Sequence, residues 1–215
     1  MDNHKSGERP CLNSNEPFET KFFVITGGPG AGKTALLEAV RKFYCHHVAF
    51  LPEAAGILFQ GGFWRVQSQS GRNAGQRAIY HVQMEMENLV RDEKVWSLGL
   101  CDRGTLDGLA YWQGSEKEFF SNLNSDKSTE IKKYEGVIHL VCPDITNGYN
   151  YQNPLRRESP QLAKEIDGRI QSIWSSHPNY IRIESSADFL DKVTLASQAL
   201  KGMTKKYLQE HCREA

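Results

Sequence analysis

The chain has 215 residues, and its 26 lysine and arginine residues balance its 26 aspartate and glutamate residues. This balance gives no general electrostatic reason to expect binding to nucleic acid or to a membrane surface. The length suits one domain with a substantial core, and no apolar run approaches the ~18 residues of a membrane span. The five cysteines lack C-x-x-C spacing, which is typical of reduced cytoplasmic thiols rather than of a disulfide framework or a zinc site.

The first predicted strand leads into a phosphate-binding motif. Residues 1–20 are polar and are expected to form a flexible N-terminal arm, and residues 21–26 then form a buried strand. Residues 27–34, GGPGAGKT, fit the P-loop pattern G-x-x-x-x-G-K-[ST], and a helix follows. The glycines allow a tight turn whose N–H groups surround an anion, above the positive end of that helix. The residues expected to bind the nucleotide are Gly28, Pro29, Gly30, Ala31, Gly32, Lys33, Thr34 and Ala35.

Two residues of this motif have distinct expected roles. Lys33 is expected to reach the β- and γ-phosphates, and Thr34 to place its hydroxyl on Mg²⁺. The alternative is a glycine-rich turn without a ligand, and the strand and helix on either side of the motif argue against it.

A short strand at 47–51 is followed by Pro52 and Glu53. In an open α/β sheet, ligands bind at the carboxyl ends of the strands, so Glu53 is placed to act as a general base or to orient a hydroxyl. Alternatively, Glu53 caps the helix predicted over 54–59. Position alone does not decide between these two interpretations.

Residues 60–71 form a predicted loop with aromatic residues, in which Trp64 is a candidate to stack on a base or ring, although such residues more often pack against the protein. A long helix follows over 73–91. Its apolar stripe is expected to be buried: Ile79, Val82, Met86 and Leu89. A polar stripe at the same spacing is expected to be solvated: Gln76, Tyr80, Gln83 and Glu87. If this second stripe lines a cleft instead, Gln83 is a candidate for bidentate hydrogen bonding to a base or amide.

A third strand over 95–101 ends at Asp102, the position of a Walker B aspartate that holds Mg²⁺ directly or through water. The next residue is Arg103, where motor-type and AAA+ ATPases usually carry a water-activating glutamate, so such an ATPase is not expected. Arg103 is a candidate to bind a substrate anion, and Asp107 to orient a hydroxyl. Alternatively, these two residues pair with each other and shape the loop. Tyr111 closes the same segment and is also expected at the substrate site.

The remainder of the chain completes the predicted sheet. Short helices are expected within 114–134, a fourth strand at 136–141 and a fifth at 179–184. Between these strands, the long loop at 144–158 is interpreted as a lid whose Arg156 and Arg157 close over the phosphates, unless they are ordinary surface arginines. Strands that alternate with helices predict a three-layer α/β/α sandwich with a five-stranded parallel sheet.

Two helices flank the fifth strand. The first is expected to begin with Ser159 as N-cap and Pro160 as first residue, and to bury one stripe: Leu162, Ile166, Ile170 and Ile173. The last is expected to bury Phe189, Val193 and Leu200, and to end at Gly202. The domain is therefore predicted to span 21–202, with 203–215 as a C-terminal helix or tail.

Five segments together resemble a known family: 27–34, 52–55 (PEAA), 75–80 (GQRAIY), 102–107 (DRGTLD) and 153–158 (NPLRRE). The chain is similar, from about residue 21 to 200, to the predicted-ATPase family of AAA-domain-labelled P-loop proteins related to the ribosylnicotinamide kinase domain of NadR. Despite its label, this family looks like the nucleoside and nucleotide kinases. The resemblance implies a five-stranded parallel sheet in which the Asp102 strand lies beside the P-loop strand.

The resemblance also implies roles for individual residues. In similar deoxynucleoside kinases, a glutamate after the second strand is the general base, and Glu53 matches that position. Asp102 and Arg103 match a pair near Mg²⁺ and the acceptor. Arg156 and Arg157 match lid arginines, without indicating which of them meets the phosphate.

These observations predict an ATP- and Mg²⁺-dependent kinase that phosphorylates a hydroxyl of a small, nucleoside- or nucleotide-like molecule. The expected catalytic residues are Lys33, Glu53, Asp102, Arg103, Arg156 and Arg157. The expected substrate-binding residues are Glu53, Trp64, Gln83, Arg103, Asp107 and Tyr111, and the expected metal ligands are Thr34 and Asp102. The alternative is a nucleotide-gated regulatory protein with weak hydrolysis. We expect a cytoplasmic protein without specific nucleic-acid binding, and the sequence leaves its oligomeric state open.

Overall fold

The computed structural model describes residues 18–143, 159–186 and 188–209. A sheet of five strands forms its centre, with the order β2-β3-β1-β4-β5. All neighbouring strands are parallel. The strands are β1 (Lys21–Thr26), β2 (Val48–Leu51), β3 (Leu98–Asp102), β4 (Tyr134–Leu140) and β5 (Tyr180–Ile183). The predicted five-stranded parallel sheet, with β3 beside β1, is confirmed.

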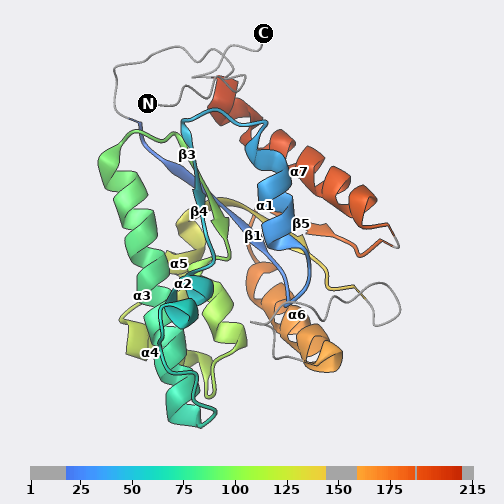
Figure 1. Cartoon of the computed structure of the whole chain (residues 1–215). Helices are drawn as coiled ribbons and strands as arrows, with labels where there is room; N and C mark the ends of the chain where they lie inside the picture. Colours follow the sequence, from blue (N-terminus) through green and yellow to red (C-terminus); the bar gives the residue numbers. More distant parts are fainter. Residues whose placement is uncertain (1–17, 144–158, 187, 210–215) are drawn as a thin grey trace.

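Helices cover both faces of this sheet (Figure 1). They are α1 (Lys33–Arg41), α2 (Ala54–Gln60), α3 (Gln69–Glu93), the 3₁₀ helix η1 (Thr105–Ala110), α4 (Glu116–Leu123), α5 (Lys127–Lys132), α6 (Pro160–Trp174) and α7 (Phe189–Gln209). One core contains buried residues of α3, η1, α4 and α6, and the other contains those of α1 and α7. The predicted three-layer arrangement is therefore confirmed.

Strand β1 shows why the sequence forms this sheet. Phe22 and Val24 pack into one core, whereas Phe23 and Ile25 pack into the other. A parallel strand that is covered on both faces needs an unbroken apolar run, because neither face meets water. The carboxyl ends of parallel strands share one edge, so the P-loop after β1 lies beside the ends of β2 and β3.

Helix α3 turns its predicted polar stripe towards the protein interior. The helix begins at Gln69, because the Ser68 side chain accepts a hydrogen bond from the backbone N–H of Gly71. The buried residues of α3 are Gly75, Tyr80, Gln83, Glu87 and Val90. The expectation that the apolar stripe is the buried one is therefore wrong, and Leu89 is 59% exposed.

The buried polar side chains of α3 have hydrogen-bond partners, which explains this reversal. The hydroxyl of Tyr80 donates to Oε1 of Glu130 over 2.7 Å. Oε1 of Glu87 accepts from Nε2 of Gln83 and from the hydroxyl of Tyr134, each over 2.8 Å. Burial of a polar group costs little when its hydrogen bonds are satisfied, so a polar stripe can replace an apolar one.

Helices α6 and α7 follow their predicted patterns only in part. Ser159 caps α6 and Pro160 opens it, as expected, and the three isoleucines of the predicted stripe are buried. Leu162 and Phe189 were expected inside but are 41% and 47% exposed. Helix α7 continues past Gly202 to Gln209, so Gly202 does not end it.

The described end of the predicted N-terminal arm is packed against the domain. Phe18 is buried, and its backbone N–H donates to the carbonyl oxygen of Lys94 over 3.0 Å. The hydroxyl of Thr20 donates to the carbonyl oxygen of Trp96 over 2.7 Å. Residues 18–20 therefore belong to the domain rather than to a flexible arm.

Candidate active site

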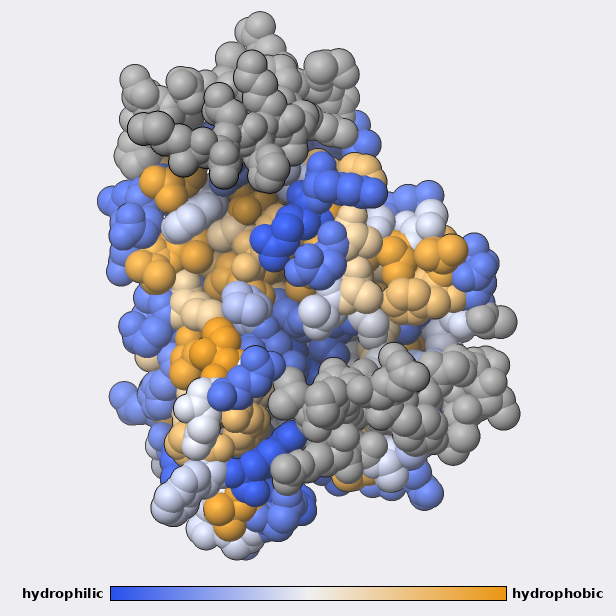
Figure 2. All heavy atoms as spheres, in the orientation of Figure 1, coloured by the Kyte–Doolittle hydropathy of each residue, from blue (hydrophilic) through white to orange (hydrophobic). Residues whose placement is uncertain are grey.

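A cleft of about 840 Å³ lies at the carboxyl edge of the sheet. Its walls come from the P-loop, α2, α3, the segment after β3 and the start of α7. Figure 2 shows a mainly hydrophilic hollow near the middle of the displayed face. The predicted site residues that line the cleft are Pro29, Gly30, Ala31, Gly32, Lys33, Thr34, Ala35, Glu53, Gln83, Arg103, Asp107 and Tyr111. Gly28, Trp64 and Asp102 do not line it, and the predicted lid arginines, Arg156 and Arg157, lie outside the described residues.

The P-loop is shaped for an anion. Gly30 and Gly32 have φ angles of 84° and 97°, in the left-handed region that favours glycine. Lys33 begins α1 and is buried, and its Nζ donates to the carbonyl oxygens of Gly27 and Gly28 over 3.0 and 2.9 Å. Burial lowers the pKa of Lys33, with a further contribution from nearby Arg103. The lysine and the positive end of α1 therefore lie at the same place, which suits a phosphate group.

Thr34 and Asp102 form the candidate magnesium site. The Thr34 hydroxyl donates to Oδ2 of Asp102 over 2.7 Å. Oδ1 of Asp102 is buried and has no hydrogen-bond partner within the described residues. Burial raises the pKa of Asp102, and the nearby Lys33 opposes this shift. Mg²⁺ prefers oxygen ligands and keeps several waters, so an unsatisfied carboxylate oxygen beside a threonine hydroxyl fits the ion or one of its waters.

Glu53 and Arg103 form an ion pair in the wall of the cleft. Although Glu53 is the N-cap residue of α2, its side chain makes no capping hydrogen bond. Its Oε1 instead accepts from Nε of Arg103 over 2.6 Å. Burial raises the pKa of Glu53, but the positive charges of Arg103 and Lys33 outweigh burial and lower it overall. Of the two interpretations of Glu53, the geometry therefore favours an ionised carboxylate at the cleft over a helix cap.

Asp107 forms side-chain hydrogen bonds to three residues, one of which is Arg103 of this ion pair. Its Oδ2 accepts from Nη1 of Arg103 over 3.0 Å and from the hydroxyl of Thr26 over 2.7 Å. Its Oδ1 accepts from Nε1 of Trp174, also over 2.7 Å. The predicted alternative of an Arg103–Asp107 salt bridge is thus present, and Asp107 uses both oxygens within the protein.

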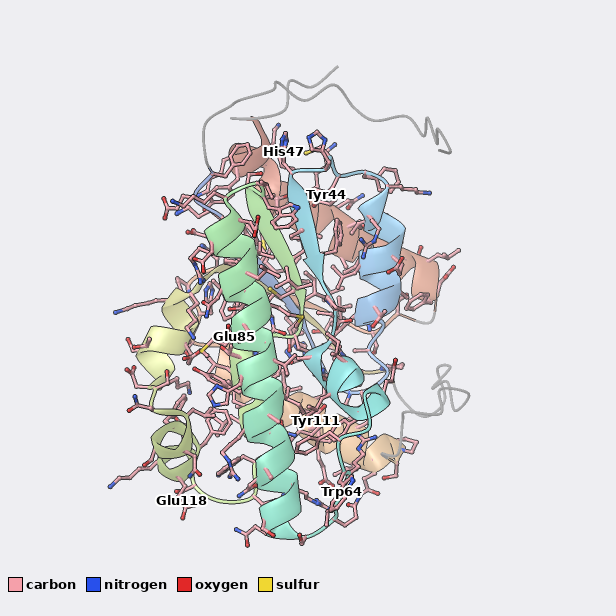
Figure 3. The ribbon with its side chains drawn as sticks, turned by 60° about the vertical axis from the view of Figure 1, so that its left-hand side comes forward. Tyr44, His47, Trp64, Glu85, Tyr111 and Glu118 are labelled. Atoms are coloured by element: carbon pink, nitrogen blue, oxygen red, sulfur yellow. The ribbon has the colours of Figure 1, made fainter. Side chains whose placement is uncertain are left out.

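The other predicted acceptor residues differ in their positions. Nε2 of Gln83 donates one of its two N–H groups to Glu87, which leaves the other N–H and the amide oxygen for a ligand. Tyr111 lines the cleft, and the guanidinium carbon of Arg103 lies 5.7 Å from its ring centre. Trp64 is 82% exposed and does not line the cleft. Figure 3 shows it near the N-terminal end of α3. Its neighbour Arg65 lines the cleft instead.

A family model described as "AAA domain" matches residues 22–192. The chain belongs to this AAA domain family. No curated protein gives a significant sequence match to it.

Solved kinases share the fold of this AAA domain. A thymidylate kinase from Candida albicans is 13% identical, with a TM-score of 0.63 over 92% of this chain and 96% of that chain. A shikimate kinase from Acinetobacter baumannii, solved in complex with shikimate, is 16% identical, with a TM-score of 0.53 over 87% of this chain and 94% of that chain.

In the described part of the chain, no helix combines the length and the apolar character that a membrane span requires.

Residues of α6 and α7 also hydrogen-bond to the P-loop backbone of the AAA domain, and the sequence did not predict these contacts. Oδ1 of Asp167, in α6, accepts from the backbone N–H of Gly28 over 2.6 Å and pairs with Nε2 of His139 at 2.9 Å. Its Oδ2 accepts from the backbone N–H of Cys142 over 3.1 Å. Burial raises the pKa of Asp167, but these hydrogen bonds outweigh burial and lower it overall. Because Gly28 donates to Asp167, its N–H does not point into the cleft.

A lysine of α7 makes a second contact of this kind. Nζ of Lys192 donates to the P-loop carbonyl oxygen of Ala31 over 2.7 Å. A sequence signal for Asp167 and Lys192 exists. Asp167 lies in the buried stripe of α6, and Lys192 lies four residues before the buried Ala196 of α7. A charged residue on the inward face of an amphipathic helix needs a specific partner.

Proposed function

We propose that this AAA domain is an ATP- and Mg²⁺-dependent kinase that transfers the γ-phosphate to a hydroxyl of a small, nucleoside- or nucleotide-like molecule. The observation that carries this proposal is the ionised carboxylate of Glu53 in the wall of the cleft that the P-loop also lines. A protein that only binds nucleotide needs the P-loop and the metal-site carboxylate of Asp102. It does not need a further carboxylate in the cleft, such as Glu53, that an arginine holds in one orientation. The kinase folds found by comparison support the same class of reaction.

Each residue has one proposed role. Lys33 and the P-loop amides hold the β- and γ-phosphates, and Thr34 with Asp102 holds Mg²⁺, which neutralises charge on the phosphates. Glu53 accepts the hydrogen bond of the acceptor hydroxyl and takes its proton as the new oxygen–phosphorus bond forms and the bond to the β-phosphate oxygen breaks. Arg103 orients Glu53. Arg156 or Arg157 stabilises the transferred phosphoryl group, a role that rests on sequence alone.

The acceptor dependence of ADP formation tests this proposal. The protein is incubated with Mg²⁺ and ATP and with a panel of nucleosides, nucleotides and other small hydroxyl compounds, and ADP and phosphorylated products are measured. We expect ADP only in the presence of one acceptor class, together with a product that carries one added phosphate. If ADP forms at the same rate without any acceptor, the kinase proposal is wrong. The protein is then a nucleotide hydrolase or a regulatory nucleotide-binding protein.

A further inference from the structure

Lys192 is a buried lysine in the wall of the cleft. It comes from α7, is 4% exposed and lines the cleft together with Ser185, Ser186 and Phe189. Its Nζ donates to the carbonyl oxygen of Ala31 over 2.7 Å and to that of Val141 over 2.6 Å. Lys192 therefore joins α7 to both the P-loop and the end of β4.

The hydrogen-bond partners of the Lys192 ammonium group carry no charge. Among residues 18–143, 159–186 and 188–209, the hydrogen-bond partners of Nζ are two uncharged carbonyl groups, and the ionised Asp167 acts on it through space without a direct bond. An ammonium group has three donors, so one N–H remains after these two bonds. Burial of a cation that forms no direct ion pair is unfavourable, and a bound anion offsets this cost.

The surroundings of Lys192 point to the nature of that anion. Lys33 is a second buried lysine at the same P-loop. Burial lowers the pKa of both ammonium groups, and the charge of Lys33 lowers the pKa of Lys192 further. Burial lowers the pKa of Lys192 to about 8, while Cys142 and Asp167 oppose this shift. Two like charges held beside one phosphate-binding loop are suited to a polyanion such as the phosphate chain of a nucleotide.

We propose that Lys192 is a positioning residue for the nucleotide, which holds the P-loop against α7 and supplies a second positive charge to the bound phosphate chain. This inference rests on the nucleotide-binding part of the proposed function and not on phosphotransfer. It makes α7 part of the nucleotide site and predicts that nucleotide affinity depends on the charge of Lys192.

The groups around Lys192 allow a clear experiment with pH. Those that interact with it are Cys142 after β4, Asp167 in α6 and Lys33 in α1. Burial raises the pKa of Cys142 to about 12, so this thiol stays neutral between pH 7 and 9. The pKa of Asp167 is lowered, so this carboxylate stays ionised. Of these three groups, only Lys33 competes with Lys192 as the source of a pH dependence of nucleotide binding. Comparison of the wild type with variants of Lys192 separates the contributions of the two lysines.

The test measures the dissociation constant of ADP with Mg²⁺ at pH 7 and pH 9 by calorimetry, without turnover. The wild type is compared with K192R, with K192M and with K201M, a control at an exposed position of the same helix. We expect wild-type affinity to fall about tenfold between the two pH values, since a lysine with a pKa near 8 changes from mostly charged to mostly neutral. K192M is expected to bind about tenfold more weakly at pH 7 and to lose this pH dependence, and K201M to match the wild type.

K192R keeps the inference testable if K192M does not fold. Because arginine stays charged at pH 9, K192R is expected to bind equally well at both pH values. The inference is overturned if K192M binds like the wild type, if K192M keeps the pH dependence, or if K192R loses affinity in parallel with the wild type. Normal binding without acceptor phosphorylation would count against the kinase proposal alone, whereas failure of the wild type to bind any nucleotide would overturn both.

Discussion

Thr34 donates a hydrogen bond to Asp102 over 2.7 Å and thereby joins the first turn of α1 to the end of β3. This contact leaves Oδ1 of Asp102 buried without a partner within the described residues. A buried polar atom without a partner is uncommon in a folded protein, and a bound ion or water is one explanation for it. The pair therefore fits a bound Mg²⁺ ion or one of its waters at the P-loop.

The first prediction concerns this pair. Asp102→Asn keeps the shape of the side chain and removes its charge, so we expect Mg²⁺ to lose its effect on nucleotide binding. Wild-type affinity for ADP is expected to rise with added Mg²⁺, and the affinity of the variant to be independent of it. Calorimetric titrations with Mg²⁺ and with EDTA measure both. An equal effect of Mg²⁺ on the two proteins would remove Asp102 from the metal site.

The second prediction concerns Arg103. Arg103→Lys keeps a positive charge but loses the planar fork that contacts Glu53, Asp107 and the carbonyl oxygen of Gly27. Asp107 is 2% exposed, so the loss of part of its pairing is expected to lower the free energy of unfolding by ~1–3 kcal/mol. Denaturant unfolding measures this change. A variant as stable as the wild type would show that Arg103 does not hold the cleft wall in place.

The third prediction concerns Asp167. Because its pKa is lowered in the folded protein, its contribution to stability is present above its ordinary value of 3.8 and is lost as the pH falls through the lowered value. Asp167→Asn is expected to cost ~2–4 kcal/mol at pH 7, since hydrogen bonds to a buried charge are strong. The cost is expected to shrink below pH 4. The control is Glu165→Gln, an exposed position of the same helix that is expected to have no effect.

Unfolding free energies of these two variants and the wild type, measured from pH 3 to pH 7, test this account. If Asp167→Asn and Glu165→Gln behave alike, the contacts of Asp167 with the P-loop contribute nothing measurable. If the cost of Asp167→Asn is the same at pH 3 as at pH 7, the charge of Asp167 is not the source of its effect.

Sequence reasoning identified those parts of the site that depend on local patterns. The P-loop is a contiguous motif between a strand and a helix, and Asp102 and Glu53 each follow a strand directly. Because all strands are parallel, their ends meet at one edge, and strand-end residues come together without further information. The lid arginines, Arg156 and Arg157, were predicted from the length of the loop at 144–158 and from the family resemblance, and they lie outside the described residues.

The contacts that hold the P-loop from outside depend on long-range packing and were not predicted. Asp167 lies 139 residues from Gly28, and Lys192 lies 161 residues from Ala31. No local pattern relates such pairs. In α3, periodicity identified both stripes but not which one is buried, because the answer depends on partners supplied by Tyr134 and Glu130.

The substitution Glu53→Gln tests the central claim most directly. Glutamine keeps an oxygen that accepts the hydrogen bond from Arg103, but it does not accept a proton at neutral pH. The account predicts that kcat for phosphorylation of the acceptor found in the panel falls by ~10²–10⁴, the usual contribution of a general base. The affinity for ADP with Mg²⁺ is expected to stay within about threefold of the wild type, because Glu53 does not hold the nucleotide. A Glu53→Gln variant that phosphorylates the acceptor at the wild-type rate would contradict the proposed role of Glu53.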